Sequence, residues 1–179
     1  YQMSVNAVLY NGSSNRNINM KALANSITKQ INDVYTISDG SFVSTMDFNI
    51  KVVNSLDEIG GRDHVFRVVD QGGLDATYPQ YAPRDVLADA NTFGLDIRIG
   101  PEATENLING SDKRTAAHEL GHTGGLRDLP TAMEDSDKLM MQGFYVGQFG
   151  GKANEALRLP QSSIREIRDN YIQNRINQK

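Results

Sequence analysis

The strongest constraint on the fold is a change in hydrophobic spacing near the start of the chain. Residues 2–10 alternate apolar and polar side chains, which predicts a half-buried strand. A turn-rich stretch, NGSSNRN, follows. From residue 20 the apolar residues recur at helical spacing, which predicts a long amphipathic helix. The predicted inward residues are Met3, Val5, Ala7 and Leu9 in the strand, and Met20, Leu23, Ile27, Ile31 and Val34 in the helix.

Period-two alternation returns further along the chain. MDFNIKVV places Met46, Phe48, Ile50 and Val52 on one face of a second strand. HVFRVVD and GLDIRIG predict two more strands, and VLADA at 86–90 predicts a short one between them. In GLDIRIG the inward residues are Leu95, Ile97 and Ile99, whereas Asp96 and Arg98 point outward.

Two further helices are predicted in the second half of the chain. One begins near Ser111 or Asp112. The other begins at about Pro160, where Ser163 and Glu166 have the spacing of a capping box. The inward stripe of the last helix comprises Ile164, Ile167, Tyr171 and Ile176. The order strand, helix, strands, helix, irregular loop, helix predicts an α/β or α+β layer structure with a mixed sheet.

Composition restricts the class of protein. A chain of 179 residues is long enough to bury a core, and we expect one domain over 1–179. The net charge of −4 without a basic run gives no reason to expect nucleic acid. The apolar runs are far too short to predict a membrane span. The chain contains no cysteine, so neither disulfides nor thiolate metal sites are available.

The chemistry of the chain is concentrated in TAAHELGHTGGLRDLP, residues 115–130. His118 and His122 are four residues apart, so on a helix both imidazoles leave the same face and can bind one zinc ion. Glu119 lies about 100° round the helix from His118 and can flank such an ion without ligating it. Gly124 and Gly125 can end the helix and let the chain turn back.

Asp128 then follows six residues after His122, where the turning chain can bring its carboxylate to the same ion. Three protein ligands leave a fourth position for water, which is the catalytic arrangement of zinc. A His-Glu-x-x-His match on its own could also be a pair of surface histidines that bind no metal. Gly125 and Asp128 argue against it, because they fall where a turn and a third ligand are needed.

The stretch HELGHTGGLRD resembles the zinc motif of the metzincin peptidases, H-E-x-x-H-x-x-G-x-x-H. His118, Glu119, His122 and Gly125 match it position for position. Asp128 departs from the common form and is similar to the aspartate of the snapalysins, small secreted bacterial proteases. The resemblance covers residues 115–144, and no subfamily is assigned.

The resemblance implies a metzincin-like zincin fold, with a twisted mixed sheet, a long N-terminal helix, a zinc helix, a Met-turn and a C-terminal helix. The upper part would be 1–125 and the lower part 126–179. One catalytic Zn²⁺ would be bound by His118, His122 and Asp128. Met140 of DKLMMQG would occupy the Met-turn, with Met141 as the alternative.

Several other residues are weaker candidates. His64 could be a metal ligand from a distant part of the sequence, but its position beside Asp63 favours a solvated residue. Glu155 resembles the third ligand of the gluzincins, although that interpretation leaves Gly125 and Asp128 unexplained. Tyr145 could approach the metal, but packing in a pocket wall fits its position better. The acidic stretches 134–137 and 70–80 lack EF-hand spacing, so a calcium site is unsupported.

These patterns predict a zinc metalloendopeptidase in which Glu119 activates a zinc-bound water. Its partners would be protein or peptide substrates, with neither nucleic acid nor membrane, and we expect a monomer. The chain opens on Tyr1 and shows no signal peptide, which favours a mature secreted protein or an excised domain. The alternatives are a narrow-target toxin or effector protease and a non-catalytic zinc-stabilised binding module.

Overall fold

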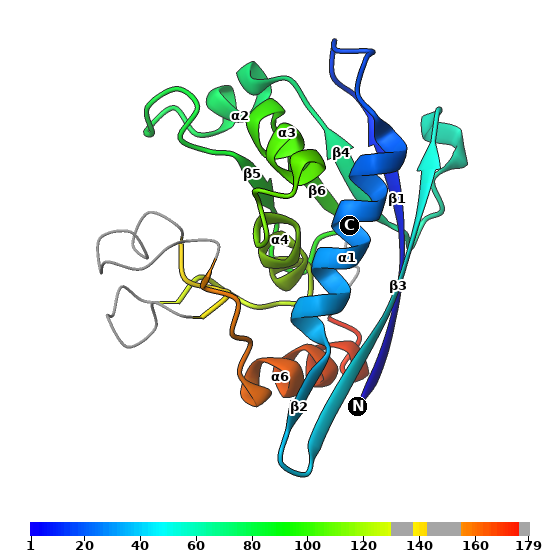
Figure 1. The fold of residues 1–179 in the computed structure, drawn as a ribbon, viewed down its shortest axis with the longest axis vertical. Coiled ribbons are helices and arrows are strands. Elements are labelled where there is room, and N and C mark those ends of the chain that lie inside the picture. The colour runs from blue at the N-terminus through cyan, green and yellow to red at the C-terminus, as the bar shows by residue number, and fades with distance from the viewer. Residues whose placement is uncertain (130–137, 143–154, 176–179) are drawn as a thin grey trace.

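The computed structural model describes residues 1–129, 138–142 and 155–175 (Figure 1). In chain order its elements are β1 (Gln2–Asn11), α1 (Met20–Tyr35), β2 (Ile37–Asp39), β3 (Phe42–Val53), the 3-10 helix η1 (Leu56–Glu58), β4 (His64–Val68), α2 (Gln71–Thr77), β5 (Ala88–Ala90), β6 (Asp96–Ile99), α3 (Pro101–Asn109), α4 (Thr115–Thr123) and α6 (Gln161–Ile172). No helix in these ranges is long and apolar enough to cross a membrane.

The strands form one mixed sheet in the order β2-β3-β1-β4-β6-β5. β1 pairs in parallel with both β3 and β4, and β4 pairs in parallel with β6. The outer strands β2 and β5 are antiparallel to their neighbours. The predicted mixed sheet and the short strand within 86–90 are therefore confirmed.

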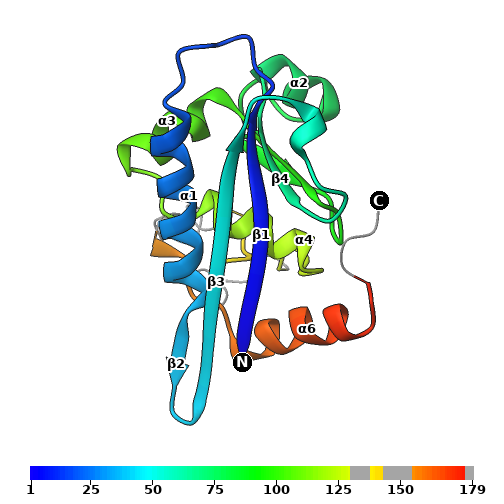
Figure 2. The same ribbon diagram turned by 90° about the vertical axis from the view of Figure 1, so that its right-hand side faces the viewer.

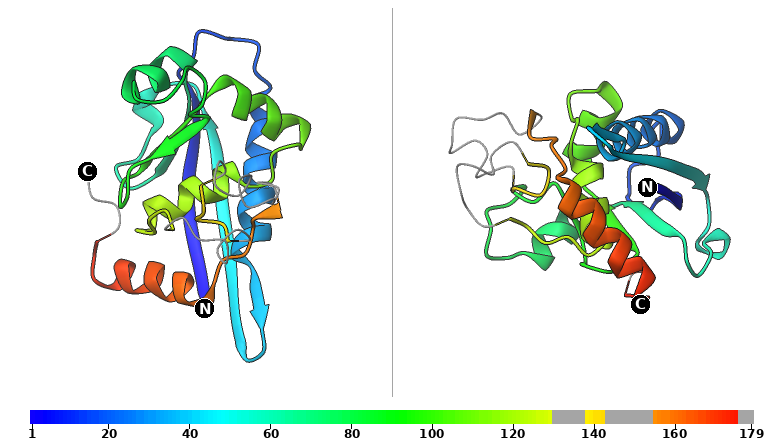
Figure 3. Two further views of the ribbon diagram at one scale, coloured as in Figure 1. Left: turned by 90° about the vertical axis from the view of Figure 1, so that its left-hand side faces the viewer. Right: turned by 90° about the horizontal axis from the view of Figure 1, so that it is seen from below.

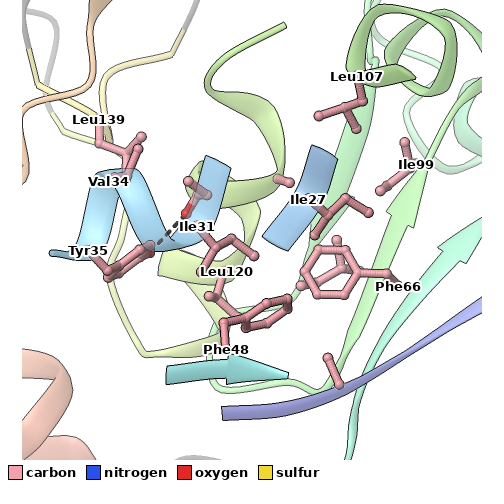
Figure 4. Close-up of a cluster of buried hydrophobic side chains, with 14 of the residues drawn as sticks. Ile27, Ile31, Val34, Tyr35, Phe48, Phe66, Ile99, Leu107, Leu120 and Leu139 are labelled. Atoms are coloured by element: carbon pink, nitrogen blue, oxygen red, sulfur yellow. Dashed lines mark hydrogen bonds between the residues drawn. The ribbon is translucent and has the colours of Figure 1, made fainter. Parts of the chain in front are cut away.

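Helices α1, α3 and α4 cover one face of the sheet. Figure 2 shows the sheet from its other face, with β1 and β3 toward the viewer. The main core lies between these helices and the sheet. In Figure 4, Ile27 and Ile31 of α1 point toward Phe48 and Phe66, whose rings meet edge to face at 5.9 Å. The inward residues predicted for β1, α1 and the strand at 46–53 all belong to this core or pack against it.

Four elements were absent from the sequence interpretation, one of them the short 3-10 helix η1. β2 forms a hairpin with β3 around Gly40, which has a φ of +58°. α2 occupies part of the stretch read as an acidic loop. α3 begins with Pro101 and ends at Asn109, and Gly110, which follows it, has a φ of +77°. Proline at a helix start and glycine after its end is a sequence signal that could have identified α3.

One helix boundary and one helix cap also differ from the prediction. The helix that carries the histidines begins at Thr115 rather than near Ser111 or Asp112. The last helix begins at Gln161, as expected, but Ser163 lies inside it, so the predicted capping box does not form. Its predicted inward Tyr171 is 71% exposed, and Ile176 lies outside the described residues.

His64 is not the solvated residue that the sequence suggested. It begins β4, is 8% exposed, and shares a face of the strand with Phe66. Its Nδ1 atom has no hydrogen-bond partner among the described residues. Burial lowers the pKa of His64 to about 4, against a smaller opposing effect of Asp63. The folded protein therefore keeps this imidazole neutral at pH values where the unfolded chain protonates it.

We predict that His64 makes the protein less stable in acid. The pKa of His64 is lower in the folded protein than in the unfolded chain. The free energy of unfolding is therefore highest above pH 6.5 and decreases as the pH falls toward 4, because the unfolded chain binds a proton that the folded protein does not. Between pH 7.5 and pH 4.5 the free energy of unfolding should fall by about 2–3 kcal/mol more in the wild type than in His64→Leu. Urea unfolding of both metal-free proteins at the two pH values measures this difference. Equal losses in the two proteins would contradict a neutral buried His64.

Candidate metal centre

Helix α4 carries His118, Glu119 and His122, and side chains from outside the helix satisfy its first turn. The backbone N–H of Thr115 donates to Asp112 Oδ1 at 2.9 Å. The N–H of Ala117 donates to Gln30 Oε1 of α1 at 3.0 Å. Because first-turn N–H groups have no partner within their own helix, these two acceptors define where α4 begins. They also fix α4 against α1.

The core side of α4 is buried against α1 and the sheet. The hydroxyl of Tyr35 donates to the carbonyl of Ala117 at 2.8 Å, deep in the core. Figure 3 shows α4 crossing the helical face of the molecule between α3 and α6. His118 is 8% and Glu119 7% exposed, so the helix places both groups in a largely dry environment.

A tight turn at Gly125 ends α4 and redirects the chain. Gly125 has a φ of +95°, and its N–H and that of Leu126 bond back to His122 O and Gly121 O. A side chain at Gly125 would collide with Phe93 and with Asn170 of α6. Glycine is therefore required here both by the backbone conformation and by the lack of space, which fits the predicted role of Gly125. Gly124 itself keeps a right-handed helical conformation.

The two imidazoles are oriented by backbone carbonyls. His118 Nδ1 lies 2.7 Å from the carbonyl oxygen of Leu139, and His122 Nδ1 lies 2.9 Å from that of Leu126. Since a carbonyl oxygen only accepts, both Nδ1 atoms carry the hydrogen, and in a neutral ring Nε2 keeps its lone pair. The Nε2 atoms of His118 and His122 lie 3.3 and 3.7 Å from Asp128 Oδ1.

The three ligand atoms of His118, His122 and Asp128 lie within 4.8 Å of one another. In the described part of the chain this is the one group of histidine and carboxylate side chains placed to bind a metal ion. Gln142 donates to the second carboxylate oxygen of Asp128 at 3.0 Å, which leaves Oδ1 directed at the histidines. The residues that the sequence singled out as ligands are thus brought together.

Glu119 lies beside this cluster and is more buried than Asp128, whose side chain is 37% exposed. Burial raises the pKa of Glu119 to about 7. The charges of His118 and Arg114 oppose this rise, and those of Asp89 and Asp128 add to it. A carboxyl group with a pKa near neutrality can both accept and release a proton.

Met140 packs directly beneath α4. It lies in a turn closed by the Met141 N–H bonding to Lys138 O at 3.2 Å. A methyl group on Gly121 would come within 2.6 Å of the Met140 sulfur, so the thioether occupies the space left by that glycine. The backbone carbonyl of Met140 also accepts the N–H of Leu129, which connects the turn to the chain just after Asp128.

The remaining candidates are not part of the cluster. His64 is buried in β4, and Glu155 is exposed. Within 70–80, Asp75 accepts hydrogen bonds from Gln71 and from the N–H of Arg84. Tyr145 and the acidic stretch 134–137 lie outside the described residues.

Four residues that support the site were not identified from the sequence: Gln30, Tyr35, Arg114 and Asn170. Asn170 of α6 donates to the carbonyl of Gly124 at the end of α4. Gln30 and Asn170 lie at helical spacing on otherwise apolar stripes, so a polar residue in such a position could have marked both. No comparable signal pointed to Arg114.

The order of elements, the mixed sheet and the helix carrying the paired histidines define a zincin-like fold. The structure is similar to the crystal structure of archaemetzincin from Methanopyrus kandleri, with a TM-score of 0.50. The match covers 93% of this chain and 96% of that one, at 14% sequence identity. No protein-family profile and no curated protein sequence matches the chain. At this sequence identity the likeness concerns the fold alone.

We predict that Gly125→Ala will lower the free energy of unfolding by at least about 2 kcal/mol, because it combines a left-handed backbone with a steric collision. Gly73→Ala is the matched control, since Gly73 lies in α2 with open space around it. That control should leave stability unchanged or raise it by about 0.5–1 kcal/mol. Urea unfolding of the metal-free proteins measures both. Equal effects of the two substitutions would contradict the role given to Gly125.

Proposed function

We propose that this protein is a zinc-dependent endopeptidase. The observation that carries the proposal is the convergence of His118 Nε2, His122 Nε2 and Asp128 Oδ1, with the buried Glu119 beside them. A likeness in fold to archaemetzincin supports the same class of enzyme. A purely structural zinc site would have no need of the Glu119 carboxyl group, which argues against a non-catalytic binding module.

The chemistry of the donor set fits zinc. Two imidazole lone pairs and one carboxylate oxygen are directed at one another, which is unfavourable unless a cation or a proton lies between them. Burial, followed by the charge of His118, lowers the pKa of His122 and so favours its neutral, ligating form. Each Nδ1 hydrogen is bonded to a carbonyl oxygen, as is usual for histidines that bind metals.

A zinc ion bound by these residues would polarise the scissile carbonyl and lower the pKa of the attacking water. Glu119 would accept the proton of that water and pass it to the leaving amine. In the metal-free protein burial raises the pKa of Glu119, and the positive charge of a bound zinc ion would favour the ionised carboxylate that accepts the proton. The buried surroundings of Glu119 and His118 would limit access of other water molecules.

The substrate would bind along the side of β5 that pairs with no strand in the described part of the chain, since β5 is the last strand in the sheet order. Main-chain hydrogen bonds to a strand edge give affinity with little sequence preference. Phe93, in the loop after β5, donates its N–H to the carbonyl of His122 at 3.0 Å, which keeps this edge beside the metal centre. We expect a specificity pocket walled by residues 142–145, of which only Gln142 lies within the described part of the chain.

Two finer assignments belong to the same proposal. Asp128 is the third ligand in preference to Glu155, because its carboxylate lies in the cluster with both histidines. The turn with Met140 acts as the Met-turn, since the Met140 side chain packs under α4 at Gly121. We further expect a secreted, monomeric enzyme that acts on protein or peptide substrates. A toxin or effector with a single target would use the same chemistry.

Glu119→Gln should reduce hydrolysis of casein by about 10²–10⁴-fold, because the amide cannot accept the proton of the attacking water. The variant should still bind one equivalent of zinc, since Glu119 is not a ligand. Glu155→Gln is the matched control and should retain both activity and zinc. Turnover with and without a chelator, together with metal content by atomic absorption, tests this. Near-normal turnover in Glu119→Gln would refute the proposed role of Glu119.

A further inference from the structure

We propose that Arg114 is a positioning residue of the metal centre, which holds the carbonyl of Leu139 against His118. This inference rests on the proposed function of the site. The Arg114 side chain precedes α4 and is only 7% exposed. Its guanidinium group lies 3.3 Å from His118 Nδ1, on the side of the ring away from Asp128.

The guanidinium group joins two segments that follow the zinc helix. Its terminal nitrogen donates to the carbonyl of Leu139 at 2.6 Å, and its Nε donates to that of Ala156 at 3.2 Å. The N–H of Leu139 in turn donates to the carbonyl of Arg158 at 2.9 Å. Arg114 therefore joins the turn that contains Met140 to the chain at Ala156.

His118 depends on this arrangement because its Nδ1 donates to the same Leu139 carbonyl, at 2.7 Å. A carbonyl oxygen has two lone pairs and can accept from both groups at once. If the carbonyl moved away, the His118 ring would lose the bond that sets its rotation. The Nε2 lone pair would then no longer be fixed toward Asp128.

His122 offers an internal comparison, because its acceptor needs no such support. Its Nδ1 donates to Leu126, four residues further on, and the turn at Gly125 fixes that carbonyl through the Leu126 N–H bond to Gly121 O. The acceptor of His118 is 21 residues away in sequence. Loss of Arg114 should therefore affect one histidine and spare the other.

The geometry requires arginine rather than any cation. Only a planar fork can donate from Nε and from a terminal nitrogen in two fixed directions, whereas a lysine ammonium is a single point on a flexible stem. Burial lowers the pKa of Arg114 to about 10, opposed by the negative charges of Glu119, Asp112 and Asp128. The group therefore remains charged, and its donors remain available, at neutral pH.

The test uses ¹⁵N-labelled full-length Arg114→Gln and Arg114→Lys, with Arg67→Gln as control. Arg67 is a partly buried arginine of β4 that pairs with Asp96, outside the metal centre. The first readout is the exchange rate of the His118 Nδ1 hydrogen in metal-free protein, with that of His122 as internal standard. The second is the Kd for zinc, by competition with a chelator.

We expect the His118 Nδ1 hydrogen to exchange at least about tenfold faster in Arg114→Gln while that of His122 is unchanged. The Kd for zinc should rise by about 10–100-fold, with a smaller rise in Arg114→Lys. Arg67→Gln should change neither. Unchanged His118 exchange and zinc affinity would overturn the inference, as would equal acceleration at both histidines.

If Arg114→Gln does not fold, the His118 exchange rate and the Kd for zinc are measured in Arg114→Lys instead. The same results then support or overturn the inference. Because neither readout needs peptide hydrolysis, a wild type that binds zinc but cleaves nothing would contradict the proposed function and leave the role of Arg114 standing.

Discussion

Burial of helix α4 is the constraint on which the rest of the structure depends. A helix that carries two histidines and a glutamate into a dry interior must have its terminal N–H and C=O groups satisfied there. Gln30 of α1 does this for the first turn, and Asn170 of α6 does it for the last. Elements far apart in sequence thus meet at α4, and their contacts fix the positions of His118 and His122.

Backbone groups also orient the two histidine side chains. Both histidines use main-chain carbonyls as partners for Nδ1, a position at which metal-binding histidines use either a carbonyl or a carboxylate. A backbone partner has the cost that its own position must be secured. For His122 the turn at Gly125 provides this locally, and for His118 the Arg114 guanidinium provides it from a distance.

What could be predicted from the sequence follows from the range of each interaction. The strands other than β2, and helix α1, were predictable because a helical or strand period is local, and so was the shared face of His118 and His122. Asp128 was proposed from its offset after the glycine turn, and the resemblance to metzincins supported it, because spacing alone does not decide where a turning chain leads. Arg114 could not be predicted, since its acceptors are carbonyls 25 and 42 residues away. The burial of His64 was missed because one polar residue starting a strand carries no sign of what covers it.

The central claim is that His118, His122 and Asp128 bind a single zinc ion. Diffraction data from crystals of the zinc-loaded protein, collected on both sides of the zinc absorption edge, would locate the ion directly. The account predicts one anomalous peak bonded to Nε2 of both histidines and to a carboxylate oxygen of Asp128, with Glu119 outside the ligand set. A peak bonded to Glu155 in place of Asp128, or to either Nδ1 atom, would contradict it.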